Sequence, residues 1–411
     1  MAAMQASRQS SSAVPRSLWV TNDFPPRVGG AQTYYWQIIQ TLDPRDVVIV
    51  APAHEGAAEF DASHPYTVVR TPFTTVWPLP SAERLCERLV REHRLEVLQL
   101  GHPLPAGVLG PWLRRTARLP YVIFLGGAEI TVPGALPGLS RLLGWVLAES
   151  SALFTVSEYT AGQAVRLSGG VARAEVLRPA LDVDSYPLTT PEAAAAARAR
   201  LGVGEGPLVV CVGRLVPRKG QDMLIEALSG AGLDGVRDVQ LALVGGGRLA
   251  RELRERAAAA GLADRVFLPG EVPDDELRLW LQAADVFAGP SRTRHRGLEV
   301  EGYGIVYAEA ALTGLPVIAG CSGGAPEAVE DGMTGYVVDA HGPDQLRAAL
   351  GRLLTMHPME RRAMGERGRR LALSRHSPAV AAERYHDLLS TVASDTSCRT
   401  QAEERTGGRP Q

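Results

Sequence analysis

A lysine and two arginines follow one apolar run in a pattern that suits a diphosphate. The block Gly213–Gly220 reads Gly-Arg-Leu-Val-Pro-Arg-Lys-Gly, and Lys219 is the only lysine in a chain with 43 Lys and Arg residues. An arginine does not reproduce the compact ammonium of a lysine. Charge-assisted hydrogen bonds from Arg214 and Lys219 to phosphate oxygens contribute ~1.5–3 kcal/mol each. We therefore predict a diphosphate site here, with a solvated basic loop as the alternative.

Two glutamates, Glu301 and Glu309, flank the start of a predicted helix. Gly304 precedes that helix, so the backbone amides of Ile305 and Val306 can face a phosphate. Carboxylates accept hydrogen bonds from sugar hydroxyls, and beside a diphosphate they are unfavourable unless they pair with hydroxyls or cations. The pattern favours a sugar nucleotide over a bare phosphate. An ordinary helix start with acidic residues is the alternative.

Glycines also follow other strand-like runs. Gly29 and Gly30 open a predicted helix after the first strand, where backbone amides can approach an anion. Gly245 begins a Gly-x-Gly-x-x-Ala pattern, which resembles a dinucleotide fingerprint. Because that pattern follows the second strand of its series and not the first, we interpret it as a nucleotide-side turn and not as an NAD site.

Short apolar runs alternate with helical patterns along the whole chain. Continuous Val/Ile/Leu strands between helices predict parallel sheets covered on both faces, so the fold class is α/β with two doubly wound, Rossmann-like domains. Ligands of such sheets bind beyond the carboxyl ends of the strands, and we expect a cleft between the two domains. The predicted strands are 17–22, 47–52, 66–70, 97–101, 121–126, 153–156, 174–177, 208–215, 239–244, 266–268, 286–288, 316–319 and 335–338.

The alternation of predicted strands and helices is interrupted once, where a segment with Pro, Thr and an Ala-rich helix separates the strands of the first domain from those of the second. The predicted boundaries are a disordered leader 1–15, an acceptor-side domain 16–184, a linker 185–206, a nucleotide-sugar domain 207–375, a C-terminal helix 376–394 that returns to the first domain, and a disordered tail 395–411.

Composition excludes several classes of protein. The net charge is -2, which does not favour a nucleic-acid partner. No apolar run reaches the ~18–20 residues needed for a transmembrane segment. The four cysteines are scattered, and Cys211 and Cys321 lie in or beside apolar runs, so we expect buried, reduced thiols and a cytoplasmic protein. We expect no metal site and no cofactor.

Taken together, these blocks resemble the retaining glycosyltransferases of family 4, which have the GT-B fold. The resemblance covers about residues 17–392 and rests on Gly213–Gly220, the two glutamates and Gly29–Gly30. The blocks Thr21–Gln32, Gly297–Glu309 and Pro316–Glu327 look like actinobacterial phosphatidylinositol mannoside α-mannosyltransferases, which use GDP-mannose.

The resemblance implies a role for each block. Arg214 and Lys219 would neutralise the departing diphosphate, Glu301 would contact the transferred sugar, and Glu309 would bind the ribose. No metal would be needed, because fixed cations stabilise the leaving group. The implied donor-binding residues are Gly29, Gly30, Gly213, Val244, Gly245, Val272, Gly304, Ile305, Val306 and Glu309.

The acceptor side departs from this family. Family members commonly carry His-Gly-x-Glu after the strand 121–124, but Gly126 stands where that histidine would be. The acceptor-side candidates are Asp23, Gly126 and Glu129, and His102, after the preceding strand, is a substitute for the missing histidine or a structural residue.

Three functions follow from the resemblance and its departure. The first is mannose transfer from GDP-mannose to a phosphatidylinositol-type or other hydroxyl acceptor. The alternatives are a natural-product glycosyltransferase with another donor and a weakly active sugar-nucleotide binding protein. Pro137–Leu147 is apolar except for Arg141, and Arg114, Arg115 and Arg118 lie nearby in the sequence, so it is either an interfacial patch for a lipid acceptor at the inner membrane face or a helix with solvated arginines.

Overall fold

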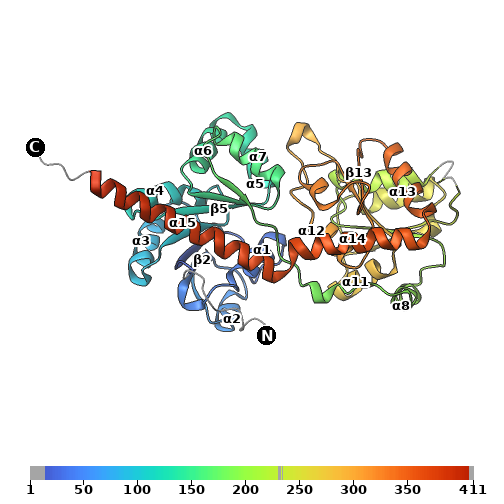
Figure 1. The fold of residues 1–411 in the computed structure, drawn as a ribbon, viewed down its shortest axis with the longest axis horizontal. Coiled ribbons are helices and arrows are strands. Elements are labelled where there is room, and N and C mark those ends of the chain that lie inside the picture. Colours follow the sequence, from blue (N-terminus) through green and yellow to red (C-terminus); the bar gives the residue numbers. More distant parts are fainter. Residues whose placement is uncertain (1–13, 230–232, 234, 407–411) are drawn as a thin grey trace, which may run out of the picture. The chain divides into compact units, whose positions relative to one another are not determined.

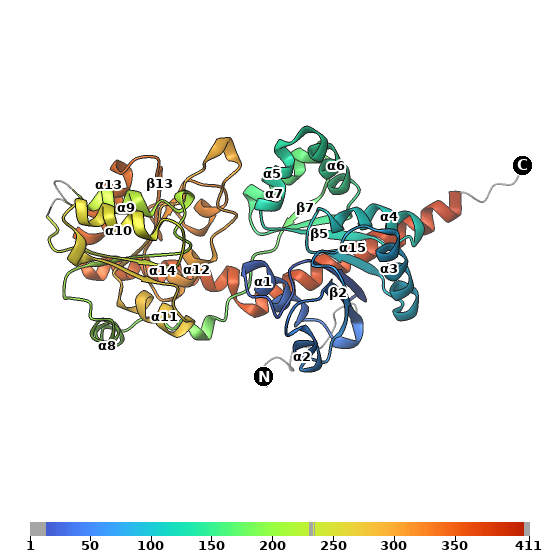
Figure 2. The same cartoon turned by 180° about the vertical axis from the view of Figure 1, so that it is seen from behind.

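Two compact units make up the structure, a computed structural model that describes residues 14–229, 233 and 235–406, with side chains described as far as Ser394 (Figures 1 and 2). Unit 1 contains the chain up to Arg178 and again from Ala379, and unit 2 contains Pro179–Pro378. Most of the predicted leader, residues 1–13, lies outside the described residues.

Unit 1 is built on a parallel seven-stranded sheet with the order β3-β2-β1-β4-β5-β6-β7. Leu18 pairs with Val48 on one side and with Leu98 on the other, so β1 lies between β2 and β4. The direction of winding reverses between β1 and β4, which is where sheets of this kind bind ligands. The strands are β1 Ser17–Val20, β2 Val47–Pro52, β3 Thr67–Thr71, β4 Val97–Leu100, β5 Tyr121–Leu125, β6 Ala152–Thr155 and β7 Ala174–Val176.

Helices cover both faces of this sheet. One face packs aliphatic strand residues such as Leu98 and Ile123 against helix residues such as Leu113. Aromatic side chains fill the other face, where the Phe124 ring lies 4.7 Å from that of Trp19. The helices are α1 Gly30–Ile39, α2 Ala57–Ala62, α3 Pro80–His93, α4 Leu109–Thr116, α5 Ala128–Ala135, α6 Pro137–Ala148 and α7 Glu158–Leu167.

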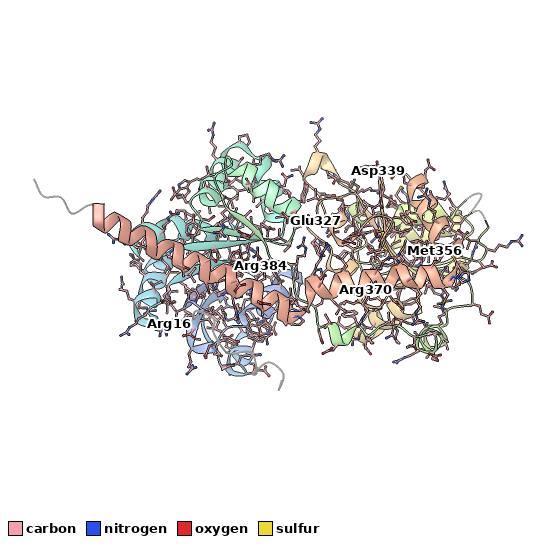
Figure 3. The ribbon with its side chains drawn as sticks, in the orientation of Figure 1. Arg16, Glu327, Asp339, Met356, Arg370 and Arg384 are labelled. Atoms are coloured by element: carbon pink, nitrogen blue, oxygen red, sulfur yellow. The ribbon has the colours of Figure 1, made fainter. Side chains whose placement is uncertain are left out.

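The long C-terminal helix α15 (Pro378–Thr406) returns to unit 1 (Figure 1). Its buried Tyr385 donates a hydrogen bond to Gln99 Oε1 on β4 at 2.9 Å. Its Arg384, labelled in Figure 3, pairs with Glu175 on β7 at 2.8 Å. Helix α15 continues to Thr406, into the segment 395–411 that we predicted to be a disordered tail. Residues 407–411 lie outside the described residues.

Unit 2 repeats the architecture with a parallel six-stranded sheet in the order β10-β9-β8-β11-β12-β13. Its switch point lies between β8 and β11. The strands are β8 Leu208–Val212, β9 Gln240–Val244, β10 Val266–Gly270, β11 Val286–Gly289, β12 Val317–Gly320 and β13 Gly335–Val338. The helices are α8 Pro191–Leu201, α9 Gln221–Leu228, α10 Ala250–Ala259, α11 Asp274–Ala283, α12 Ile305–Leu312, α13 Asp344–Thr355 and α14 Pro358–His376.

The stretch 185–206, which we predicted to be a linker, lies within unit 2. Ala197 of α8 is buried in the core, and Arg198 donates to Ala283 O at 2.9 Å and to Asp285 Oδ2 at 2.7 Å. These contacts join α8 to the end of α11. The prediction of a buried thiol at Cys321 is wrong, because β12 ends at Gly320 and Cys321 is exposed, whereas Cys211 is buried.

In the part of the chain that the structure describes, no helix is both long enough and apolar enough to cross a bilayer.

Candidate active site

The turn after β8 brings Lys219 back over the end of that strand. Gly213 has φ 142°, and a Cβ there would lie 3.4 Å from Lys219 Cε. Gly220 ends the turn with φ 73°, and a Cβ there would lie only 2.0 Å from the carbonyl oxygen of Pro290. Only glycine combines a left-handed backbone with so close an approach. The two glycines therefore fix where the ammonium points.

Lys219 and Arg218 converge on a single carboxylate. Lys219 Nζ lies 2.5 Å, and Arg218 Nη1 2.8 Å, from Glu301 Oε2. Only 9% of the Glu301 side chain is exposed. Burial raises the pKa of Glu301, but the charges and hydrogen bonds of Lys219 and Arg218 outweigh burial and hold this pKa below its usual value. The three groups carry a net charge of about +1, which favours an anion beside them.

The backbone around Glu301 is held by the Gly323–Gly324 segment. Gly323 has φ 55°, and a Cβ there would lie 2.0 Å from Glu301 O. Gly324 N donates to Glu301 O at 2.9 Å, and Glu301 N donates to Ser322 Oγ at 3.2 Å. The glycine pair after β12 therefore positions Glu301 by close backbone packing.

Helix α12 begins beside Glu301 with no side-chain cap. Gly304 at its N-cap has φ 84° and ψ 75°, so Ile305 and Val306 form the first turn, whose amides have no partner within the helix. Tyr307 OH donates to Gly289 O at 2.7 Å, which ties this first turn to β11. Amides and dipole at such a helix start favour a bound phosphate.

Glu309 lies about one turn further along α12. Burial raises the pKa of Glu309 to about 7, a hydrogen bond with Tyr186 lowers it, and the charge of Asp274 raises it. A carboxyl group this strongly shifted is typical of a binding site.

The other predicted donor residues fall into two groups. Gly245 N donates to Gly270 O at 2.8 Å, so the segments Val244–Gly245 and Pro269–Val272 lie side by side. A Cβ on Gly245 would lie 2.3 Å from Gly213 O, which gives the glycine pattern a packing role. Val244 is buried, whereas Arg214 is exposed, and no ion pair of Arg214 is found among the described residues. Its role stays a prediction.

Three contacts of this site were not predicted from the sequence. Arg218, and not Arg214, pairs with Glu301, and only its position next to Lys219 could have indicated this. Ser291 Oγ donates to Glu301 Oε2 at 3.3 Å, and a lone serine gives no signal. Tyr303 and His376, 73 residues apart, share a buried hydrogen bond of 2.6 Å that anchors the loop carrying Glu301.

Metal ligation finds no support in the described residues, because they contain no group of three His, Cys, Asp or Glu side chains that could hold an ion.

Unit 1 carries the remaining predicted residues. Gly29 and Gly30 form the start of α1, and a Cβ on Gly30 would meet nothing within 4 Å. Glu129 Oε1 accepts hydrogen bonds from the amides of Gly126 and, at 3.0 Å, Gly127. Asp23 follows β1 and accepts from Gln32 Nε2 at 2.7 Å.

Comparison with known families covers most of the chain. A family model described as Glycosyltransferase Family 4 matches residues 28–185, and one described as Glycosyl transferases group 1 matches residues 195–371. HepE of Anabaena, solved with UDP, superposes with a TM-score of 0.76 over 92% of this chain and 100% of its own, at 22% identity. This likeness concerns the fold.

Curated relatives are similar over nearly their whole length. The GDP-mannose-dependent alpha-(1-6)-phosphatidylinositol monomannoside mannosyltransferase of Mycolicibacterium smegmatis is 41% identical over 380 residues, which are 91% of this chain and 98% of that relative. A Corynebacterium glutamicum mannosyltransferase named for a monoacylated form of the same acceptor is 36% identical over 92% of this chain and 99% of its own. The chain therefore belongs to glycosyltransferase family 4 and has the GT-B fold of two Rossmann-like domains.

Proposed function

We propose that this glycosyltransferase moves mannose from GDP-mannose to a hydroxyl of a phosphatidylinositol-type acceptor. The convergence of Lys219 and Arg218 on Glu301, beside the uncapped start of α12, carries the proposal. Two fixed cations and free helix amides suit a diphosphate, and the M. smegmatis relative is named for GDP-mannose.

In the proposed mechanism, the donor phosphates replace Glu301 as the partner of the two cations. Glu301 then accepts hydrogen bonds from the sugar hydroxyls, while Glu309 accepts them from the ribose. As the sugar–oxygen bond breaks, negative charge grows on the leaving diphosphate, and Lys219, Arg218 and the α12 amides stabilise it together with Arg214. Fixed cations in these positions make a metal ion unnecessary for that step. The acceptor hydroxyl attacks the anomeric carbon from the side of the departing diphosphate and passes its proton to a diphosphate oxygen, so the anomeric configuration is retained.

Donor binding is expected to raise the melting temperature selectively. At 100 times its Kd, a ligand stabilises the protein by about 2.7 kcal/mol, which is a rise of about 5–10 °C for a domain of this size. A thermal-shift panel of GDP-mannose, UDP-glucose and ADP-glucose measures this, and we expect the rise with GDP-mannose. A rise with another nucleotide sugar alone would reassign the donor, and no rise with any of the three would refute the proposed class of donor.

We further propose that a surface of unit 1 docks on a lipid bilayer and so reaches a lipid acceptor. Helices α5 and α6, with Leu136 between them, expose four apolar side chains: Val132 (53% exposed), Leu136 (50%), Leu139 (43%) and Leu142 (37%). Arg141 lies exposed among them, and an arginine at such an edge favours anionic lipids. An exposed apolar patch beside basic residues supports an interfacial role.

Replacing Leu136 and Leu139 together by serine is expected to lower vesicle binding at least tenfold. Burying an aliphatic side chain contributes about 1.5–3 kcal/mol, and half of that for each of two leucines exceeds one factor of ten. Co-sedimentation with vesicles of phosphatidylcholine and phosphatidylinositol measures the binding. Val171→Ser is the control, because Val171 is 72% exposed in the turn after α7. Equal binding by the double variant and the wild type would exclude this surface.

A further inference from the structure

The carboxyl ends of β1 and β4 in unit 1 bring together a histidine and an aspartate. Asp23 follows β1, and His102 follows β4. The winding of the sheet reverses between these two strands, so loops diverge here and leave the space in which such sheets bind ligands. The two side chains therefore lie where the topology of unit 1 places a ligand.

The histidine is held at both of its ring nitrogens. His102 Nε2 lies 2.6 Å from Asp23 Oδ2, and His102 Nδ1 contacts Gly101 O. Tyr35 OH donates to the same carbonyl oxygen. The other oxygen of Asp23 accepts from Gln32 Nε2 at 2.7 Å. The imidazole and the carboxylate are 21% and 22% exposed, so each keeps one edge accessible.

These contacts require a protonated ring. A neutral imidazole has one N–H and one lone pair, so one nitrogen would turn a lone pair toward an acceptor oxygen. The imidazolium donates from both nitrogens. Burial lowers the pKa of His102, but Asp23, through its hydrogen bond and charge, together with Glu129 and the Gly101 carbonyl, outweighs burial and raises this pKa. The hydrogen bond and charge of His102 lower the pKa of Asp23 and outweigh burial, which raises it. The charge of Arg27 also lowers the pKa of Asp23, but more weakly.

A second carboxylate lies within electrostatic reach of His102. Glu129 Oε1 is occupied by the Gly126 and Gly127 amides, which fixes the side chain beside the end of β5. The space over Gly126 is free, because a Cβ there would meet only the Glu129 oxygens, at 3.8 Å. The two carboxylates, the imidazolium and Arg27 carry a net charge of about zero, so the site lacks the excess positive charge that favours a phosphate and suits hydroxyl groups that donate hydrogen bonds.

We propose that His102 is the positioning residue of a polyol-binding site in unit 1, where it holds Asp23 so that this carboxylate and Glu129 accept hydrogen bonds from the ring hydroxyls of the acceptor. The inference rests on the proposed function, which makes a polyhydroxylated ring the acceptor. Asp23 has lone pairs beyond the two that Gln32 and His102 use, so it binds hydroxyls without losing its support.

His102→Ala is expected to lower kcat/KM for the acceptor 10- to 100-fold, mainly through KM, and to leave the affinity for GDP unchanged. The assay uses deacylated phosphatidylinositol monomannoside, so that membrane binding plays no part. His102→Gln, whose amide can donate to Asp23, is expected to recover part of the loss. His386→Ala is the matched control, because His386 is a half-buried histidine of unit 1 that contacts Thr41, which follows the C-terminal end of α1, whereas Gly30 lies at its start. Equal acceptor KM in His102→Ala and wild type would overturn the proposal.

The pH profile separates positioning from simple structural support. Because both hydrogen bonds need the cationic ring, wild-type kcat/KM for the acceptor is expected to fall as the pH rises through the raised pKa of His102. His102→Ala is expected to lack this fall. A variant that keeps the wild-type profile would contradict the role of His102, even if its activity were low.

An experiment without turnover keeps the inference separate from the proposed function. The Cε1 proton of His102, assigned by its loss in His102→Ala, is expected to titrate with a pKa above that of a free histidine in wild type and at lower pH in Asp23→Asn. Adding the deacylated monomannoside is expected to shift this signal. A signal that neither titrates high nor responds to the probe at millimolar concentration refutes the site, whereas a wild type that fails to transfer mannose refutes only the proposed function.

Discussion

Replacing Lys219 by alanine is expected to lower kcat for mannosyl transfer by about 10²–10³-fold, the loss typical of removing one group that stabilises charge in the transition state. Lys219 carries the cation nearest to Glu301, and Gly213 and Gly220 fix the turn that holds it. Steady-state kinetics with saturating GDP-mannose measures the loss. Lys219→Arg keeps the charge but not the compact head, so we expect it to recover only part of the activity.

Stability must be followed in the same variant, because Glu301 is buried. Without Lys219 that carboxylate keeps Arg218 as its one cationic partner, together with the Ser291 hydroxyl, and the loss of one charged hydrogen bond costs about 1–3 kcal/mol. Lys219→Ala combined with Glu301→Gln removes the unpaired charge and is expected to restore the melting temperature but not the turnover. Arg254→Ala, at an exposed cation of α10, serves as the control. Full turnover in a folded Lys219→Ala protein would contradict the proposal that Lys219 stabilises the leaving diphosphate.

The sheets were predictable because a strand that is buried on both faces is apolar at nearly every position of the sequence. The run Val47–Pro52 is apolar at every position, and the structure has a fully buried strand over the same residues. Strand ends were less predictable. The run 208–215 is apolar almost throughout, but β8 ends at Val212, because Gly213 turns the backbone to φ 142°. A pattern of apolar residues carries no information about that dihedral angle.

The packing of helix α8 could not be predicted from its composition. Its alanine-rich sequence has no marked apolar face, so the sequence indicated a linker. The structure fixes it through Arg198, whose partners Ala283 and Asp285 are more than eighty residues away. Hydrogen bonds between residues so distant along the chain leave no local signal.

The sequence predicted where the site residues lie in the fold, but not which side chains they contact. Residues after strand ends are brought to one edge of a parallel sheet by topology alone, which is why Lys219 and Glu301 could be assigned to one donor site from sequence. Which arginine would face Glu301 depends on the turn between Gly213 and Gly220. Likewise, the pairing of His102 with Asp23 joins two loops 79 residues apart, and no local pattern indicates it.

Replacing Glu309 by glutamine is expected to stabilise the protein above pH 7 and to weaken donor binding. The pKa of Glu309 is raised by burial to about 7, so the folded state holds a proton that the unfolded state releases near pH 4.5. This carboxyl group therefore favours folding fully below pH 4.5, and the contribution is lost as the pH rises through about 7. A shift of this size corresponds to on the order of 3 kcal/mol. Urea unfolding at pH 5 and pH 8 measures it.

The matched control is Glu360→Gln, at an exposed carboxylate near the start of α14, which is expected to change the free energy of unfolding equally at both pH values. In wild type, a ribose hydroxyl that donates to Glu309 favours the ionised carboxylate, so donor binding near pH 6 should release a proton. Calorimetry of GDP binding in buffers of different ionisation enthalpy detects that release, and Glu309→Gln should abolish it. A wild type that binds GDP without releasing a proton would place the ribose elsewhere. The loss of stability that the ionised Glu309 causes in the free protein above pH 7 is then the consequence of keeping a half-buried hydroxyl acceptor on α12, and nucleotide binding offsets it.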